Sequence, residues 1–191
     1  TVRRKSRHFQ SYEEVAKKFA KLLGMDPWLI NPLHAQCGQV DFGTPGGLDC
    51  VRANAESLLT KVRRKYKEYG INEKAFVMVK SDRGTGGLGL MTVRDVKDLD
   101  DTERLARLGV SAAQGGTDLT EVIIQEGVPT FEHIGDAVAE PVVYMIDRYV
   151  VGGFYRTHAG RAFDESLGGP GAAYEQLAFA ESTQLPRPGV K

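Results

Sequence analysis

A lysine followed by a glycine-rich loop is the clearest place in this sequence for binding chemistry. Lys80 ends an apolar run, and the stretch after it reads SDRGTGGLGL. Glycine allows a backbone to turn at positive φ and lets its N–H groups approach a ligand, so successive N–H groups can form a concave anion site. The residues that suit such a site are Gly84, Thr85, Gly86, Gly87 and Gly89. With Lys80 as a fixed cation the pattern favours a triphosphate, and a plain turn beside a solvated lysine is the alternative.

Three other nucleotide-binding motifs fit the surrounding sequence poorly. GTGGLG matches the G-x-G-x-x-G spacing, but a dinucleotide fold needs a helix directly afterwards, and LMTV predicts a strand. A P-loop ends in Gly-Lys-Ser/Thr, whereas Gly89 is followed by Leu90. A protein kinase has its lysine after the loop and an H-R-D motif later, and neither is present. The remaining interpretation is a hairpin of two strands whose glycine loop folds over phosphates.

Two helices are expected before this hairpin. In the first, Ser11 and Glu14 form a capping box, an apolar stripe follows, and Gly24 ends the helix. The stripe consists of Val15, Phe19, Leu22 and Leu23. The second helix runs from about Asp49 to Tyr69 and ends at Gly70. Its stripe consists of Val51, Ala55, Leu58, Leu59, Val62, Tyr66 and Tyr69.

From residue 75 onward the apolar pattern is typical of strands. Strands are expected at 75–80, 90–93 and 121–128, and the third is apolar enough to be central in a sheet. Residues 140–158 predict a hairpin that turns near Asp147–Arg148. The expected fold class is α+β with an antiparallel sheet. We expect a helical section at 1–72, a nucleotide-binding section at 73–180 and a loose tail at 181–191.

Composition argues against several classes of partner. Lys plus Arg and Asp plus Glu number 25 each among 191 residues, so no net charge draws the protein to nucleic acid or an anionic membrane. No apolar run is long enough to span a membrane. Cys37 and Cys50 lack any zinc-binding pattern, which favours two reduced thiols in a cytoplasmic protein.

The arrangement of strand, lysine, glycine loop and strand resembles the ATP-grasp fold, and EVIIQEGV resembles the hinge segment of that fold. Four stretches then carry a closer resemblance, to the proteobacterial ATP-grasp type of glutamate–cysteine ligase. They are DPWLINPL, EVIIQEGVPTFE, DAVAEPVVYMIDRYVVGGFYR and GGPGAAYEQLAF, and the resemblance extends from about residue 9 to 179. Members of that family are much longer, so we expect a central section or a shortened relative.

The resemblance implies the first step of glutathione synthesis, in which ATP activates the γ-carboxylate of glutamate and the amine of cysteine attacks it. It places Gln125, Glu126 and Val128 along the adenine, partly through backbone groups, and Glu132 near the ribose. Arg156 and Lys80 would face the phosphates. The implied Mg²⁺ ligands are Asp147, Asp164 and Glu165. Because adjacent residues of an extended strand face opposite ways, Glu165 is preferred over Asp164.

The sequence departs from this family at Ser166 and Gly168, where the family carries asparagines, and at Gly86, where it carries an aromatic residue. Two hypotheses therefore remain: an active ligase, and a nucleotide-binding domain without turnover that acts with a partner. A Rossmann oxidoreductase is a third, which the strand after the loop argues against. The sequence does not fix the oligomeric state, and a homo-oligomer is one expectation.

Overall fold

The structure is a computed structural model that describes residues 4–44, 46–83, 90–101, 103–107, 119–162, 165, 167–168 and 171–177. The chain divides into two compact units, Thr1–Val128 (unit 1) and Pro129–Lys191 (unit 2), which are described separately. The boundary expected near residue 72 falls inside unit 1, because segments from both sides of it pair in one sheet. The expected tail at 181–191 lies outside the described residues.

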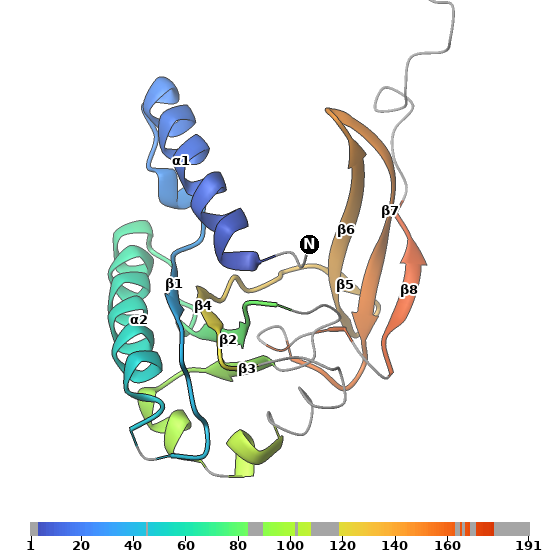
Figure 1. Ribbon diagram of the computed structural model, residues 1–191. Helices are drawn as coiled ribbons and strands as arrows, with labels where there is room; N and C mark the ends of the chain where they lie inside the picture. The colour runs from blue at the N-terminus through green and yellow to red at the C-terminus, as the bar shows by residue number, and fades with distance from the viewer. Residues whose placement is uncertain are drawn as a thin grey trace, which may run out of the picture. The chain divides into compact units, whose positions relative to one another are not determined.

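Unit 1 is built on a four-stranded antiparallel sheet with the strand order β1-β4-β2-β3 (Figure 1). Its strands are β1 (His34–Cys37), β2 (Val77–Ser81), β3 (Leu90–Val93) and β4 (Val122–Glu126). Strands β2 and β3 flank the glycine loop and pair with each other, with Lys80 opposite Leu90. The apolar strand β4 is an inner strand of the sheet. The prediction of two strands around the loop, with no helix directly after it, is confirmed.

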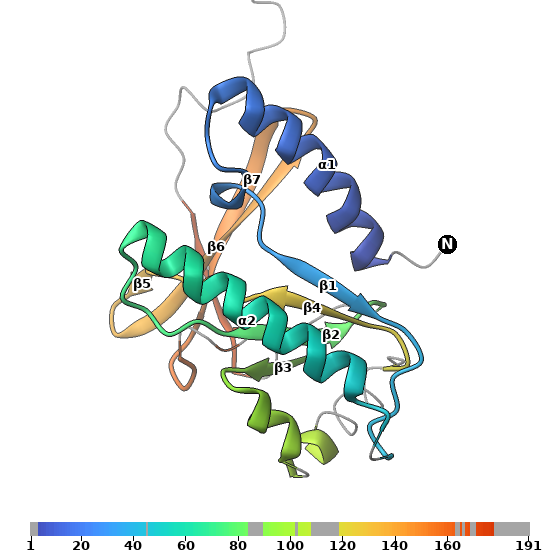
Figure 2. The ribbon, with the colours of Figure 1, turned by 90° about the vertical axis from the view of Figure 1, so that its left-hand side faces the viewer.

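Helix α2 (Asp49–Tyr69) packs along one face of this sheet (Figure 2). Its apolar stripe joins Val77, Val79, Val122 and Ile124 of the sheet in one buried core. The helix ends at Gly70, whose φ of 66° is left-handed and whose N–H donates to the carbonyl oxygens of Lys67 and Tyr66. The predicted bounds of α2 are therefore confirmed, and most of its stripe is buried as predicted.

Helix α1 (Lys5–Leu23) differs from the expectation at its start and in its packing. Ser11 lies inside the helix, so the predicted capping box is wrong. The predicted stripe is not the buried face either, since the exposed fraction is 64% at Val15 and 83% at Leu22. The buried residues of α1 are Ser6, Ala16 and Ala20. Gly24 ends the helix in the left-handed conformation, as predicted.

Short segments complete unit 1. The 3-10 helix η1 (Pro27–Leu29) follows α1, and η2 (Val96–Asp100) follows β3. Residues 103–107 form one further helical turn. No helix in the described parts of the chain has the length and apolar character needed to cross a membrane.

A disulfide joins Cys37, the last residue of β1, to Cys50 in the first turn of α2. The intervening loop folds back so that the two Cα atoms lie 6.1 Å apart. Asn54 lies beside the bridge, and its Nδ2 donates to Cys37 Sγ at 3.3 Å. The expectation of two reduced thiols is therefore wrong for this structure, because the fold brings together two residues that the sequence pattern alone did not pair.

Unit 2 contains a second antiparallel sheet, with the strand order β5-β6-β7-β8 (Figure 1). Its strands are β5 (His133–Ile134), β6 (Ala137–Ile146), β7 (Tyr149–His158) and β8 (Ala173–Gln176). The predicted hairpin is confirmed, and Asp147 occupies its two-residue turn with a φ of 54°. Aspartate tolerates this left-handed conformation better than most residues. Together the two units give a mixed α/β fold with antiparallel sheets.

Candidate functional site

The sheet of unit 1 has one face that α2 covers and one face that carries the candidate site. Side chains alternate along a strand, so Val77 and Val79 point into the core while Lys80 points to the opposite face. Met78 pairs with Gln125 and Lys80 pairs with Ile123. Paired residues point to the same side of a sheet, so Lys80 and Gln125 share the face away from α2. The structure thus brings two of the expected ligand-binding residues to one surface.

Lys80 is partly buried on this face, and its charge is costly there. Burial, together with a smaller effect of the nearby ammonium of Lys5, lowers the pKa of Lys80 to about 8. Lys5 Nζ donates to the backbone oxygen of Ser81 at 2.7 Å, which holds the second cation next to the first. Two neighbouring cations at the start of the glycine loop form an electrostatic arrangement that an anion would stabilise.

The start of α1 is fixed at this site by the buried side chain of Asp82. Its carboxylate accepts from Ser6 N at 2.7 Å and from Ser6 Oγ at 2.8 Å. Lys5 N also donates to the backbone oxygen of Asp82 at 2.9 Å. A carboxylate at these positions caps a helix N-terminus, although here it comes from the residue that follows β2. This contact explains why α1 begins at Lys5 and why Lys5 lies beside Lys80.

Two arginines next to Lys5 and Asp82 in sequence form ion pairs with the same carboxylate, that of Glu121. Arg4 contacts Glu121 at 2.9 Å, and Arg83 contacts Glu121 at 3.1 Å. Sequence reasoning did not select Lys5 or Arg4. The sequence feature that could have indicated these two residues is the basic run at residues 3–5, where α1 begins.

Gln125 presents an acceptor to the site face. Its Oε1 is buried and has no hydrogen-bond partner among the described residues. A buried acceptor without a donor costs about 1–3 kcal/mol, so the position suits a ligand that carries an N–H group.

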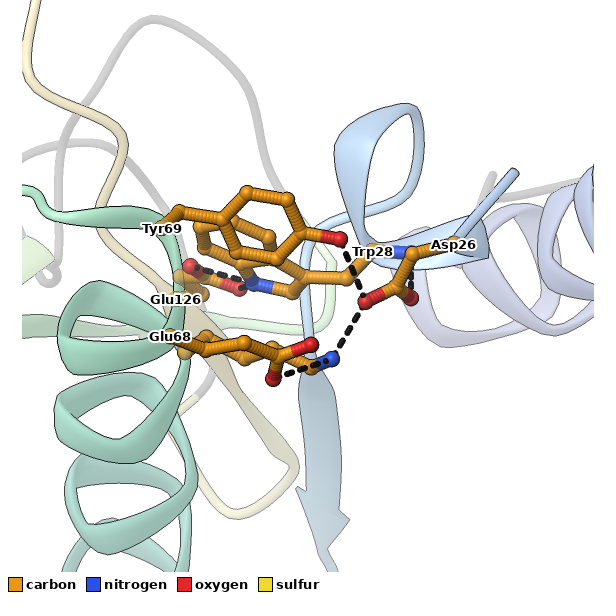
Figure 3. Close-up of polar contacts among 6 residues, drawn as sticks. Asp26, Trp28, Glu68, Tyr69 and Glu126 are labelled. Carbon is orange, nitrogen blue, oxygen red and sulfur yellow. Dashed lines mark hydrogen bonds and ion pairs between the residues drawn. The ribbon is translucent and has the colours of Figure 1, made fainter.

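Glu126 faces the other side of the sheet, as Figure 3 shows. Trp28 Nε1 donates to Oε1 at 2.9 Å and to Oε2 at 3.0 Å, and Leu33 N donates to Oε2 at 2.9 Å. Burial raises the pKa of the Glu126 carboxyl, and the bonds from Leu33 and Trp28 partly offset that effect. The carboxylate therefore joins residues 28–33 to β4. Any contact of Glu126 with a ligand beside Lys80 would come from its backbone.

Residues of α2, together with Asp26, hold the ring of Trp28 in place. Trp28 packs against Tyr69, with ring centroids 5.2 Å apart, and Tyr69 Oη donates to Asp26 Oδ2 at 2.9 Å. Lys65 of α2 forms an ion pair with Asp26. This cluster fixes the ring of Trp28 and so the carboxylate that it binds.

The other expected site residues fall in or next to unit 2. Arg156 of β7 pairs with Glu140 of β6 at 2.8 Å, and its Nε is buried with no partner in the described structure. Asp147 is exposed at the hairpin turn. Glu165 Oε2 accepts from Ala162 N at 2.9 Å.

Several further expectations rest on exposed or undescribed residues. Val128 and Glu132 are exposed. Gly84, Thr85, Gly86, Gly87, Gly89, Asp164 and Ser166 lie outside the described residues. Within the described part of the chain, no group of three His, Cys, Asp or Glu side chains gathers as a metal site would require.

Comparison with known proteins identifies the family of the chain. A family model named GshA and described as glutamate-cysteine ligase matches residues 1–191. The chain belongs to the glutamate–cysteine ligase family.

One solved structure supports this assignment to the glutamate–cysteine ligases. It is the crystal structure of "Putative gamma-glutamylcysteine synthetase" from Methylobacillus flagellatus KT, which matches with a TM-score of 0.77 and 44% sequence identity. The match covers 92% of this chain and 42% of that chain, so this chain spans less than half the length of that protein. No curated protein matches the sequence.

The residues at the site fit the triphosphate that this ligase family implies. Lys80 and Lys5 supply two adjacent cations, and Gln125 supplies a buried acceptor on the same face. The described carboxylates do not form a comparable site for a divalent metal.

Proposed function

We propose that this chain binds ATP on the face of the unit 1 sheet away from α2 and uses it to join glutamate to cysteine. In that reaction the γ-phosphoryl group of ATP passes to the γ-carboxylate of glutamate and gives an acyl phosphate and ADP. The amine nitrogen of cysteine then attacks the acyl carbon, phosphate leaves, and the amine loses a proton. The product is γ-glutamylcysteine, the precursor of glutathione.

The observation that carries this proposal is the pair of lysines at the start of the glycine loop. Lys80 is held where its charge is unfavourable, and Lys5 is fixed beside it by the contact of α1 with residues 81–82. An anion bound beside two neighbouring ammonium groups would favour the charged form of both. Phosphoryl transfer depends mainly on positioning and on neutralising charge, and these two groups would supply both.

The adenine end is proposed to lie at the end of β4. Gln125 Oε1 would accept from an exocyclic amine, which satisfies an acceptor that has no partner among the described residues. Val128, the last residue of unit 1, would contact the ring, and Glu132 the ribose. The glycine loop at 84–89 would cover the phosphates as an ATP-grasp flap does.

The metal and catalytic assignments in unit 2 remain proposals. Mg²⁺ would offset the charge of the phosphates, with Glu165 as the first choice of ligand and Asp164 and Asp147 as alternatives. The left-handed turn already accounts for an aspartate at position 147. Arg156 would face the developing charge on the transferred group, although Glu140 already pairs with it.

A second candidate function is nucleotide binding without turnover, in a complex with a partner chain. The observation that favours it is that the residues brought together at the site, Lys80, Lys5 and Gln125, suit a nucleotide, whereas Arg156, the proposed catalytic cation, is already paired with Glu140.

One experiment separates the two functions. ADP release by the purified chain is measured in the presence of ATP and Mg²⁺. Four samples are compared: no amino acid, glutamate alone, cysteine alone, and both amino acids. An active ligase gives release that depends on both amino acids, together with γ-glutamylcysteine detected by mass spectrometry. Binding of ATP without such release favours the nucleotide-binding domain. If the chain neither binds ATP nor releases ADP, both functions are contradicted.

A further inference from the structure

The disulfide of unit 1 joins a buried residue to an exposed one. Cys37, at the end of β1, is 1% exposed and belongs to the core beneath α2. Cys50, in the first turn of α2, is an exposed residue. Thiol–disulfide exchange depends on which sulfur is attacked and on access to that sulfur. A small molecule in solution therefore meets the bridge on its Cys50 side.

One amide donor contacts both sulfurs of the bridge. Asn54 Nδ2 lies 3.3 Å from Sγ of Cys37 and 3.4 Å from Sγ of Cys50. The same nitrogen donates to the backbone oxygen of Cys50 at 3.1 Å, one turn earlier in α2. Because this backbone bond does not depend on the bridge, it holds the amide in place when the S–S bond opens. A sulfur that leaves the bridge at Cys37 therefore keeps a hydrogen-bond donor although it is buried.

The bridge also closes the loop between β1 and α2. This loop is bound to the segment before β4, where Val40 N donates to Thr120 O at 2.9 Å. The next residue, Glu121, forms the ion pairs with Arg4 and Arg83. A covalent closure restricts such a loop, so opening the bridge should weaken the contact that the loop makes at Thr120.

We propose that Cys50 is a thiol-exchange site, at which a low-molecular-weight thiol opens the bridge and loosens the loop between β1 and α2. The thiolate of the small molecule attacks Sγ of Cys50, the S–S bond breaks, and its electron pair leaves on Sγ of Cys37. A mixed disulfide remains at Cys50, and the Cys37 thiolate takes a proton from solvent. The exchange consumes no separate oxidant or reductant, because one disulfide and one thiol give another disulfide and another thiol.

Cys37 makes this modification reversible. The fold keeps its sulfur next to Cys50, so a deprotonated Cys37 can attack Sγ of Cys50 and expel the small molecule as its thiolate. The concentration of the small thiol then decides how much of the protein carries the mixed disulfide. Cysteine and γ-glutamylcysteine, the thiols of the proposed reaction, belong to this chemical class, but the exchange does not depend on that reaction.

Two matched variants separate the roles of the two sulfurs, since each variant lacks the same bridge. Folded Cys37→Ala and Cys50→Ala are incubated with oxidised glutathione, and adducts are measured by mass spectrometry of the intact chain. Cys37→Ala should form a mixed disulfide at Cys50 and release reduced glutathione. Cys50→Ala should react at least about tenfold more slowly, because Cys37 is buried. In urea the two variants should react at similar rates.

The unaltered protein tests the same assignment without a substitution. It is incubated briefly with reduced glutathione, quenched with acid, and unfolded in the presence of a maleimide before peptide mapping. We expect glutathione on Cys50 and the maleimide on Cys37. Hydrogen exchange of the Val40 N–H should be at least about tenfold faster in the opened protein than in the closed one, because its bond to Thr120 is weakened.

Four results would overturn the proposal. Glutathione on Cys37 with the maleimide on Cys50 would reverse the assignment of the attacked sulfur. Equal rates for the two folded variants would show that burial does not select the site. A bridge that resists reduced glutathione in the folded protein, at concentrations that open it in urea, would exclude the exchange. Equal exchange of the Val40 N–H in the closed and opened protein would show that the bridge does not hold the loop.

Discussion

Trp28 Nε1 hydrogen-bonds both carboxylate oxygens of Glu126, 98 residues further along the chain. The contact joins the segment after α1 to the end of the strand that we propose lies beside the adenine. Glu126 N donates to Leu33 O at 2.7 Å and strengthens the same junction. A carboxylate that the sequence suggested as a ligand contact is therefore part of the support for the site.

Trp28→Phe should destabilise unit 1, because it removes one donor from a buried carboxylate. We expect a loss of about 2 kcal/mol in the free energy of unfolding, measured by urea denaturation. Leu29→Ala, at the neighbouring exposed position, is the control and should cost much less. A Trp28→Phe variant as stable as the unaltered protein would show that the contact contributes nothing.

The buried carboxyl of Glu126 should make stability depend on pH. Burial raises its pKa in the folded state, so the folded protein holds this proton more readily than the unfolded chain does. The contribution of Glu126 is then fully present below the ordinary pKa of a glutamate and is lost as pH rises through the raised value.

Unfolding of the unaltered protein and of Glu126→Gln should be compared from about pH 4 to pH 7. The stability of the unaltered protein relative to the variant is expected to fall as pH rises and then to level off. A relative stability that rises over this range would contradict the direction of the shift.

Local signals predicted α2 but not the start of α1. The stripe of α2 and its glycine stop both lie within the helix sequence and its next residue. The cap of α1, in contrast, is supplied by Asp82, which is 76 residues away from Ser6. No spacing rule within residues 1–24 could reveal that contact, whereas Ser11 and Glu14 fit the local pattern of a capping box.

The same long-range contact explains why Lys80 was predicted and Lys5 was not. Lys80 is adjacent to the glycine loop in sequence, whereas Lys5 reaches it only through the packing of α1 on the end of β2. The orientation of Glu126, however, could have been predicted. The alternation that separated Asp164 from Glu165 also separates Gln125 from Glu126, and applying it to both pairs would have placed Glu126 on the core side.

Asp82→Ala should uncouple the start of α1 from the sheet. The variant leaves Ser6 N and Oγ without their acceptors, and we expect a loss of about 2–3 kcal/mol in the free energy of unfolding. Ser6→Ala removes only the hydroxyl bond and should cost roughly half as much. Equal effects of the two substitutions would contradict the capping role of the carboxylate.

The disulfide should contribute measurably to stability, because it closes a loop with a sequence separation of 13. Cys50→Ala is expected to lower the free energy of unfolding by about 3 kcal/mol. A reducing agent should have a similar effect on the unaltered protein and none on the variant. Thiol titration of the denatured, non-reduced protein should find no free thiols, and two reactive thiols per chain would refute the bridge.

The central claim is that Lys80 and Lys5 bind the phosphates of a nucleotide. Its most direct test is calorimetric titration of a non-hydrolysable ATP analogue into the unaltered protein, Lys80→Ala, Lys5→Ala and the exposed control Lys74→Ala. We expect affinity to fall at least about tenfold in the first two variants and to stay unchanged in the control.

The pH dependence of the same titration identifies the charge of Lys80. Because its pKa is lowered to about 8, affinity in the unaltered protein should fall as pH rises through that value, whereas Lys80→Arg should bind equally well on both sides of it. Undiminished affinity in Lys80→Ala, with no change across this pH range in the unaltered protein, would contradict the account.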